Sequence, residues 1–230
     1  MKNIDVLPKD IIDFEDIKGQ DHAKRAITVA LAGMVHNTLL YGCHGTGKTM
    51  FLDALRSTKL LPEAITLVDN LDRLSFKELQ SLEDKPFIAT IKTCPCGYYS
   101  HPTKSCKCSP SKIVKFFEKI IDSGVLEHVE IFAELSILYA RELEHPHKQQ
   151  STNDIIRQIK DKTDYKDLSL GKPSNTLLGC AYREMNLTPR QYDQIVRVAR
   201  TVANLDCSEH IEVEHISEAI QYKNNKVGIF

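Results

Sequence analysis

Apolar and polar residues follow two different periodicities along this chain. Short apolar runs at residues 37–41, 64–69 and 86–91 are typical of strands buried in a parallel sheet. Apolar residues at helical spacing lie between Gln20 and Gly33 and over most of the chain after residue 150. The most regular helix follows Thr188-Pro189, and its apolar face is formed by Tyr192, Ile195, Val196, Val198, Ala199, Val202 and Leu205. The pattern predicts an α/β domain with a small parallel sheet, followed by an all-helical domain.

The order of these patterns divides the chain into segments. Residues 141–150 are charged and turn-prone, which indicates a linker between two domains. We expect an N-terminal extension at 1–18, the α/β domain at 19–140, the helical domain at 151–225 and a tail at 226–230.

Composition restricts the classes of function. The chain has 230 residues, enough for one sizeable core and a small second domain. Its formal net charge of −1 provides no basic field, so DNA binding has no support from bulk electrostatics. No apolar run reaches membrane-spanning length, and residues 1–5 lack the apolar segment of a signal peptide. We therefore expect a cytoplasmic protein without a membrane partner, whose seven cysteines are thiols or metal ligands.

A glycine-rich loop follows the first apolar run. Residues 42–49 read Gly-Cys-His-Gly-Thr-Gly-Lys-Thr, which is the spacing G-x-x-x-x-G-K-T between a strand and a helix. Such loops surround phosphate oxygens with backbone N–H groups, and the following helix adds its positive dipole end. Lys48 then faces the β- and γ-phosphates of ATP, and Thr49 ligates Mg²⁺. The expected nucleotide-binding residues are Gly42, Gly45, Thr46, Gly47, Lys48 and Thr49. The alternative is a glycine-rich turn that binds nothing.

The second apolar run ends in an acid, Asp69, which is the Walker B pattern. A buried parallel strand there delivers its carboxylate beside the Mg²⁺, so Thr49 and Asp69 are the candidate magnesium ligands. Lys48 and Asp69 are the candidate catalytic residues. The residue that follows Asp69 is Asn70. An amide can hold a water molecule but cannot take its proton, and Asp72 is displaced along the turn.

Four of the cysteines are clustered, in two C-x-C pairs formed by Cys94, Cys96, Cys106 and Cys108. Four thiolates that a turn-rich loop brings together suit a tetrahedral Zn²⁺ site. The alternative is a loop with four free thiols, and His101 is a possible substitute ligand. Cys43, Cys180 and Cys207 are isolated, and we expect the last two to be small apolar core residues.

Several segments resemble AAA+ ATPases of the magnesium-chelatase subunit I group, especially its ComM/YifB branch. These are residues 16–26, the loop at 42–49, the C-P-C-G-Y-Y … C-x-C segment at 94–108 and residues 187–201. The resemblance covers residues 10–225 and implies a P-loop AAA+ domain with a helical lid, which binds ATP, Mg²⁺ and Zn²⁺. It also implies that Arg190 is the sensor-2 arginine, which contacts the γ-phosphate from the lid.

This chain departs from the family pattern at positions that support hydrolysis. Asn70 replaces the catalytic glutamate, Lys92 replaces the sensor-1 asparagine, and His128 replaces the arginine finger. Only residues 56–63 separate the P-loop helix from the Walker B strand, where relatives carry pore-facing loops. A Lon-protease-like domain at the N-terminus of relatives is also not expected here, so the chain resembles a truncated and divergent member.

Three functions remain open on these observations. The first is an ATP-binding AAA+ protein with weak or no hydrolysis, which acts as a nucleotide-dependent binding or regulatory module. Its partners would be copies of itself or intact family members in an oligomer. The second is an active ATP-driven motor that remodels DNA in competence-type recombination. The third is a degenerate remnant without activity.

Overall fold

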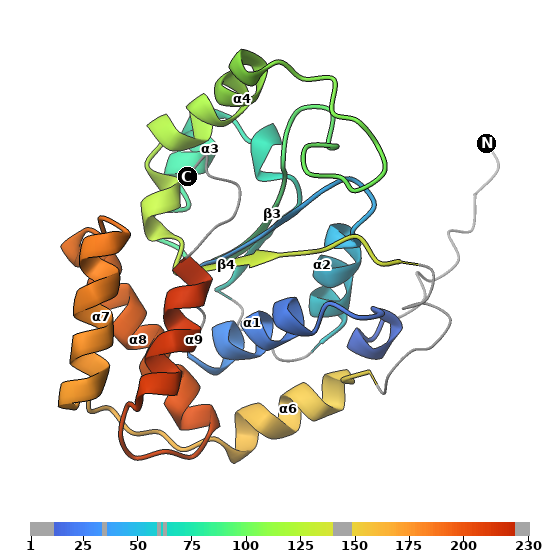
Figure 1. Cartoon of the computed structure of the whole chain (residues 1–230). Coiled ribbons are helices and arrows are strands. Elements are labelled where there is room, and N and C mark those ends of the chain that lie inside the picture. The colour runs from blue at the N-terminus through green and yellow to red at the C-terminus, as the bar shows by residue number, and fades with distance from the viewer. Residues whose placement is uncertain (1–11, 34–35, 59–60, 62–63, 140–148, 224–230) are drawn as a thin grey trace.

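A computed structural model describes residues 12–33, 36–58, 61, 64–139 and 149–223 (Figure 1). The strands are β1 (Thr38–Gly42), β2 (Thr66–Val68), β3 (Phe87–Lys92) and β4 (Ile131–Glu134). The longer helices are α1 (Asp21–Ala32), α2 (Lys48–Ser57), α3 (Phe76–Gln80), α4 (Pro110–Asp122), α6 (Thr152–Asp161), α7 (Lys172–Glu184), α8 (Pro189–Leu205) and α9 (Val213–Lys223). Short 3₁₀ helices are η1 (Phe14–Asp16), η2 (Leu71–Arg73) and η3 (Val125–His128). The expected linker at 141–150 lies largely outside the described residues, as do most of the N-terminal extension and the tail.

The four strands form one parallel sheet in the order β2-β3-β1-β4. This sheet confirms the reduced parallel architecture expected from the apolar runs. Strand β4 was not among the expected strands, because its four residues follow a 3₁₀ helix without a long apolar run. In the register of β1 with β3, Gly42 is the partner of Lys92. The segments that leave these two strands therefore begin side by side at the carboxyl edge of the sheet.

Alternate residues of the central strands supply two separate cores. Leu40, Ile88 and Ala133 belong to the core that contains α1 and α2. Leu39, Ala89 and Phe132 belong to the opposite core, beneath α3 and α4. This period of two is the geometry of a strand buried on both faces, and it accounts for the continuous apolar runs in the sequence.

Helices α6 to α9 form the C-terminal helical domain, which packs on the α1 side of the sheet (Figure 1). Thr188 caps α8 by accepting the N–H of Gln191, as the Thr-Pro sequence predicted. Buried residues of α8, including Ile195, Val198 and Val202, share one core with α1. The expectation for Cys180 and Cys207 was wrong, because both thiols are exposed. Among the described helices, none has both the length and the apolar content needed to cross a membrane.

A partly buried polar joint connects the amino end of β4 to α8. The Glu130 carboxylate lies 2.9 Å from His36 Nδ1 and 3.0 Å from the Arg197 guanidinium, and His36 Nε2 lies 2.9 Å from the Thr201 hydroxyl. Burial by itself would raise the pKa of Glu130, but the hydrogen bonds and charges of His36 and Arg197 outweigh it. The pKa of Glu130 is therefore lowered to about 2.

We predict that Glu130→Gln destabilises the chain by about 2–3 kcal/mol at pH 7, because it leaves Arg197 and His36 without their buried anion. A carboxylate with a lowered pKa stabilises the fold above its unfolded pKa, and this contribution is lost as the pH falls toward 2. Urea unfolding of both proteins from pH 7 down to pH 3 should therefore show a difference that shrinks below about pH 4.5.

The control is Glu127→Gln on the same turn, because the Glu127 side chain is 76% exposed. This variant should unfold within about 0.5 kcal/mol of the parent. An equal loss of unfolding free energy in both variants, or a Glu130→Gln effect that does not depend on pH, would contradict the stabilising role of this joint.

Candidate nucleotide and metal sites

The glycine-rich loop lies at the carboxyl end of β1 and leads directly into α2. Gly45 and Gly47 adopt left-handed conformations, with φ of +88° and +86°, which glycine tolerates without strain. Helix α2 begins at Lys48, so its free N–H groups face the loop. A cavity of about 380 Å³ lies between this loop, Asp69 and Lys92, which is large enough for part of a nucleotide.

The Lys48 ammonium group is folded back into its own loop. Nζ donates to the carbonyl oxygens of Gly42 at 2.8 Å and Cys43 at 2.5 Å, and Thr46 Oγ1 lies 3.3 Å away. Burial lowers the pKa of Lys48 to about 8, although the charge of Asp69 acts in the opposite direction. Phosphate oxygens would give this desolvated cation the anionic partner that the loop carbonyls supply only in part.

Thr49 and Asp69 meet at the edge of the same cavity. The Thr49 hydroxyl donates to Asp69 Oδ2 at 3.4 Å, and the Thr90 hydroxyl donates to Oδ1 at 2.7 Å. A hydroxyl and an oriented carboxylate are the oxygen ligands that Mg²⁺ takes beside a triphosphate, so this pair fits the ion. Thr90 was missed in the sequence analysis. The available signal was a polar residue inside a strand that is otherwise buried and apolar.

Two of the substituted catalytic positions border the cavity. Asn70 has a left-handed backbone, with φ of +60°, and its N–H donates to Thr90 Oγ1 at 2.9 Å. Lys92 Nζ lies 3.5 Å from Asp72 Oδ2, and this carboxylate is only 10% exposed. The other oxygen of Asp72 is buried without a hydrogen-bond partner among the described residues. Asp72 is therefore the counter-ion of Lys92, and it is not among the residues that line the cavity.

Arg190 and His128 lie together, at the opposite edge of the sheet. The Arg190 guanidinium donates to His128 Nδ1 at 2.7 Å, and Glu127 Oε2 lies 3.9 Å from it. His128 precedes β4, and its carbonyl oxygen accepts a bond from Asn37, which precedes β1. The P-loop follows the far end of β1, and the length of β1 alone separates the two edges by about 13 Å. The structure therefore places Arg190 away from the P-loop of its own chain, and its role as the sensor-2 arginine stays a prediction.

The four clustered cysteines converge after β3. The Sγ atoms of Cys94, Cys96, Cys106 and Cys108 all lie within 4.8 Å of one another. Three of the separations are 3.4, 3.7 and 3.6 Å, close to the spacing of about 3.8 Å expected for thiolates around Zn²⁺. Backbone N–H groups of Tyr98 and Lys107 lower the pKa of Cys96, whereas burial and the neighbouring thiols raise the pKa of Cys106 and Cys108.

Other features of the cysteine loop agree with a four-thiol site. His101 is outside the cluster, and its Nδ1 accepts the backbone N–H groups of Thr103 and Lys104. The N–H groups of Tyr99 and Cys108 donate to the sulfurs of Cys94 and Cys106 at 3.3 and 3.4 Å. Such N–H···S bonds stabilise thiolate charge, and the donor set suits Zn²⁺ better than a hard ion such as Mg²⁺.

Comparison with known proteins identifies the family to which these sites belong. A family model described as "Magnesium chelatase, subunit ChlI" matches residues 13–85 and 79–143. A second, for the ChlI C-terminal region, matches residues 134–223. The chain belongs to the magnesium chelatase subunit ChlI family.

A curated relative supports the same assignment. The chain is 22% identical to competence protein ComM of Haemophilus influenzae over 314 residues, covering 94% of this chain and 60% of the relative. The aligned length exceeds that of this chain, so ComM carries segments without a counterpart within the matched region. Membership of the ChlI family confirms the α/β domain followed by helices and the expected resemblance, while the roles of individual residues in this chain stay predictions.

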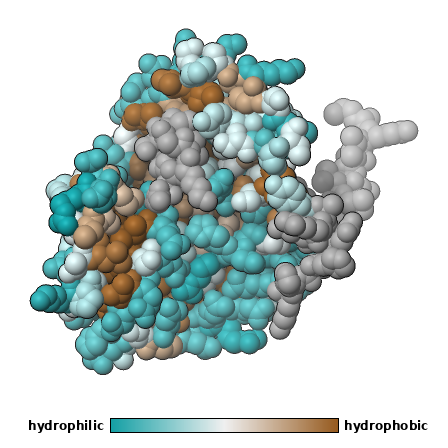
Figure 2. All heavy atoms as spheres, viewed as in Figure 1, coloured by the Kyte–Doolittle hydropathy of each residue, from teal (hydrophilic) through white to brown (hydrophobic). Residues whose placement is uncertain are grey.

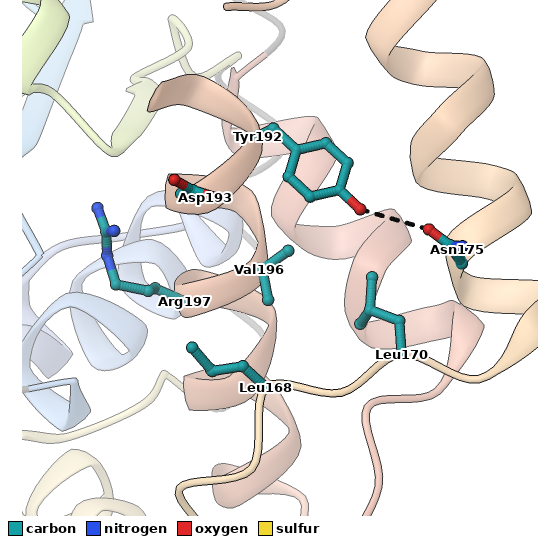
Figure 3. A pocket seen from close by; sticks show the side chains of 7 residues that line it. All are labelled: Leu168, Leu170, Asn175, Tyr192, Asp193, Val196 and Arg197. Atoms are coloured by element: carbon teal, nitrogen blue, oxygen red, sulfur yellow. Dashed lines mark hydrogen bonds between the residues drawn. The ribbon is translucent and has the colours of Figure 1, made fainter. Parts of the chain in front are cut away.

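A further cavity lies in the helical domain and is lined by no residue of the P-loop or of the cysteine loop. It measures about 560 Å³ and lies between α7, α8 and the segment before α7 (Figure 3). Leu168, Leu170 and Val196 form its apolar wall, and the Tyr192 hydroxyl donates to Asn175 Oδ1 at 3.3 Å across it. Apolar side chains also gather on the surface of this helical domain (Figure 2). None of the residues expected to bind nucleotide or metal lines this cavity.

We predict that ATP affinity is constant below about pH 8 and weakens above it, by up to about tenfold per pH unit. Bound phosphate favours charged Lys48, so its pKa is higher in the complex than in the free protein. The affinity that this charge contributes is then complete below the free pKa and is lost as the pH rises toward the bound one. Titration calorimetry with Mg-ATP from pH 7 to pH 9.5 measures the effect.

The same titration should be repeated with two variants. Lys48→Ala should abolish detectable binding, while Lys77→Ala on the exposed face of α3 should bind like the parent. Unchanged affinity in Lys48→Ala would show that the loop does not hold the phosphates.

Proposed function

We propose that this chain is an ATP- and Mg²⁺-binding AAA+ protein with weak or no ATP hydrolysis, which acts as a nucleotide-dependent binding or regulatory module. The observation that carries the proposal is that one cavity combines candidate binding groups with a substituted catalytic position. The groups that would hold phosphate and metal converge there, while the position of the general base is occupied by Asn70.

Binding is supported by the preorganised half of the site. The left-handed glycines and the start of α2 direct backbone N–H groups to the same space as Lys48. Thr49 and Asp69 provide oxygen ligands for Mg²⁺, which would neutralise charge on the β- and γ-phosphates. Lys92 adds a second cation at the border of the cavity, where the family pattern has an amide.

Weak hydrolysis is supported by the residues found at the positions of the general base and the arginine finger. The Asn70 amide can orient a water molecule but takes no proton from it. Asp72 is paired with Lys92, so it is not free to serve as the base. His128 and Arg190 contact each other at the opposite edge of the sheet, where they can reach a P-loop only in a neighbouring copy or an intact relative. Histidine is shorter than arginine and largely uncharged at neutral pH, so it is a poor arginine finger.

We predict that the purified chain binds Mg-ATP with a steady-state turnover far below 1 s⁻¹. Loss of a general base typically costs about 10²–10⁴ in rate. Loss of an arginine finger costs about 10³–10⁵, and the two losses do not simply multiply. Phosphate release and nucleotide affinity should be measured on the same preparation, with Lys48→Ala as the background.

Two variants distinguish the contributions of Asn70 and His128 to the low turnover. Asn70→Glu alone should raise turnover little, whereas Asn70→Glu with His128→Arg should raise it more when the chain assembles. Turnover typical of AAA+ motors in the unaltered chain would disprove the proposal, and so would failure to bind ATP at all.

We further propose that the cysteine cluster holds one Zn²⁺ with a structural role. Four thiolates close the coordination sphere and leave no position for a substrate, unlike the open sites of catalytic zinc. The cluster lies next to the core beneath α4, because Cys94 is buried and the other three thiols pack against that core.

We predict about one zinc ion per chain in protein purified under reducing conditions, because a Cys₄ set binds one ion. Removal with a chelator should lower the melting temperature, since metal binding to the folded state contributes folding free energy. Cys96→Ser should lose most of the metal, whereas Cys180→Ser, at an exposed thiol in α7, should retain it. Elemental analysis that finds no zinc in the reduced parent would rule the site out.

A further inference from the structure

The cysteine loop lies directly against the phosphate-binding loop. Gly42 and Lys92 are register partners at the ends of β1 and β3, so both loops leave the sheet at the same point. The backbone N–H of His44 donates to the carbonyl oxygen of Gly97 at 2.7 Å, and the Cys43 thiol donates to the carbonyl oxygen of Tyr99 at 3.0 Å. The Thr93 hydroxyl donates to the same oxygen of Tyr99 at 2.9 Å.

Close packing accompanies these hydrogen bonds. Gly97 has a left-handed backbone, with φ of +77°, and a Cβ atom there would lie 3.1 Å from His44 Cβ. The rings of His44 and Tyr98 contact each other edge to face, with centroids 6.1 Å apart. The turn at residues 97–99 therefore packs closely against Cys43 and His44, the first two variable residues of the P-loop.

One continuous set of polar contacts runs from a candidate metal ligand to the phosphate-binding lysine. The N–H of Tyr99 donates to Cys94 Sγ at 3.3 Å, and the carbonyl of Tyr99 accepts the Cys43 thiol. The carbonyl of Cys43 in turn accepts Lys48 Nζ at 2.5 Å and the Thr46 hydroxyl at 3.0 Å. Each step joins neighbouring groups, so a displacement of the cysteine loop moves the carbonyl that orients Lys48.

We propose that the cysteine loop is a positioning element of the nucleotide site, and that metal binding and nucleotide binding are thermodynamically coupled through Gly97, Tyr99 and Cys43. This inference rests on the proposed function, because it requires both ligands. When the four thiolates share a metal ion, the turn at 97–99 is fixed and holds Cys43 and His44 in place for phosphate. Without the ion, only the hydrogen bonds to Gly97 and Tyr99 hold the turn, and part of the nucleotide-binding free energy is spent on ordering the rest of the loop.

The coupling has a reciprocal consequence that needs no variant. If metal raises the affinity for ATP by some factor, ATP raises the affinity for metal by the same factor. We expect a factor on the order of tenfold, within the range of about 5- to 150-fold typical of coupled sites.

The experiment compares four states of the full chain. Titration calorimetry measures the affinity for Mg-ATP in zinc-loaded and chelator-treated protein, and circular dichroism reports whether the treated protein is folded. Competition with a chromophoric chelator measures the affinity for Zn²⁺ with and without Mg-ATP. Weaker ATP binding after zinc removal, matched by weaker zinc binding without ATP, is the expected result.

Variants of Cys43 test the route of coupling in the zinc-loaded state. Cys43→Ala removes the donor to Tyr99 without touching a metal ligand, and should weaken ATP binding while zinc content is unchanged. Cys43→Ser retains an O–H donor and should bind ATP more like the parent. Cys180→Ala is the matched control, because that thiol is exposed in the helical domain and should affect neither ligand.

The outcomes distinguish this inference from the proposed function. Parent protein that binds ATP equally with and without zinc, in the folded state, would overturn the coupling alone. Equal ATP affinity in zinc-loaded Cys43→Ala and parent would overturn it as well, even if the stripped protein unfolds. Zinc-loaded parent that binds no ATP would overturn the proposed function together with the coupling.

Discussion

The parallel pairing of β1 with β3 is the constraint on which both candidate sites depend. Its register places Gly42 opposite Lys92, so the P-loop and the cysteine loop leave the sheet as neighbours. Strand β2 pairs with β3 in the same direction, which brings Asp69 to that edge beside Thr49. Parallel sheets characteristically gather their functional groups at the carboxyl ends of the strands, and here this rule also brings the candidate metal-binding loop to the candidate phosphate site.

Much of this arrangement could be predicted because its causes are local in sequence. The apolar runs predicted β1, β2 and β3, and the glycine spacing predicted a loop whose backbone turns left-handed at Gly45 and Gly47. The convergence of four cysteines was also predictable, since two C-x-C pairs in a short loop have few ways to avoid one another. Strand β4 was not predicted, because Glu130 and Glu134 limit its apolar run to three residues.

The interactions that could not be predicted join segments that are distant in sequence. The Arg190–His128 contact spans 62 positions, and no local pattern places these side chains at the edge opposite the P-loop. The joint between Glu130, His36 and Thr201 likewise depends on how the helical domain packs against α1. Cys180 was misjudged because tertiary packing decides which face of a helix is buried, and Cys207 lies in the turn after α8. Asn70 and Lys92 stand beside the candidate binding groups, and His128 lies at the opposite edge. This combination favours the proposed protein, which binds nucleotide and releases it largely unhydrolysed.

The most direct test of this account is the chemical identity of the nucleotide after long occupancy. Zinc-loaded protein in excess over Mg-ATP should be incubated for several hours, freed of unbound ligand and denatured, and the released nucleotide should be separated by chromatography. The account predicts ATP, nearly unchanged, with the Asn70→Glu, His128→Arg double variant yielding more ADP. Stoichiometric ADP from the unaltered chain, absent with Lys48→Ala, would contradict the account, since a working base would then have to exist in the site.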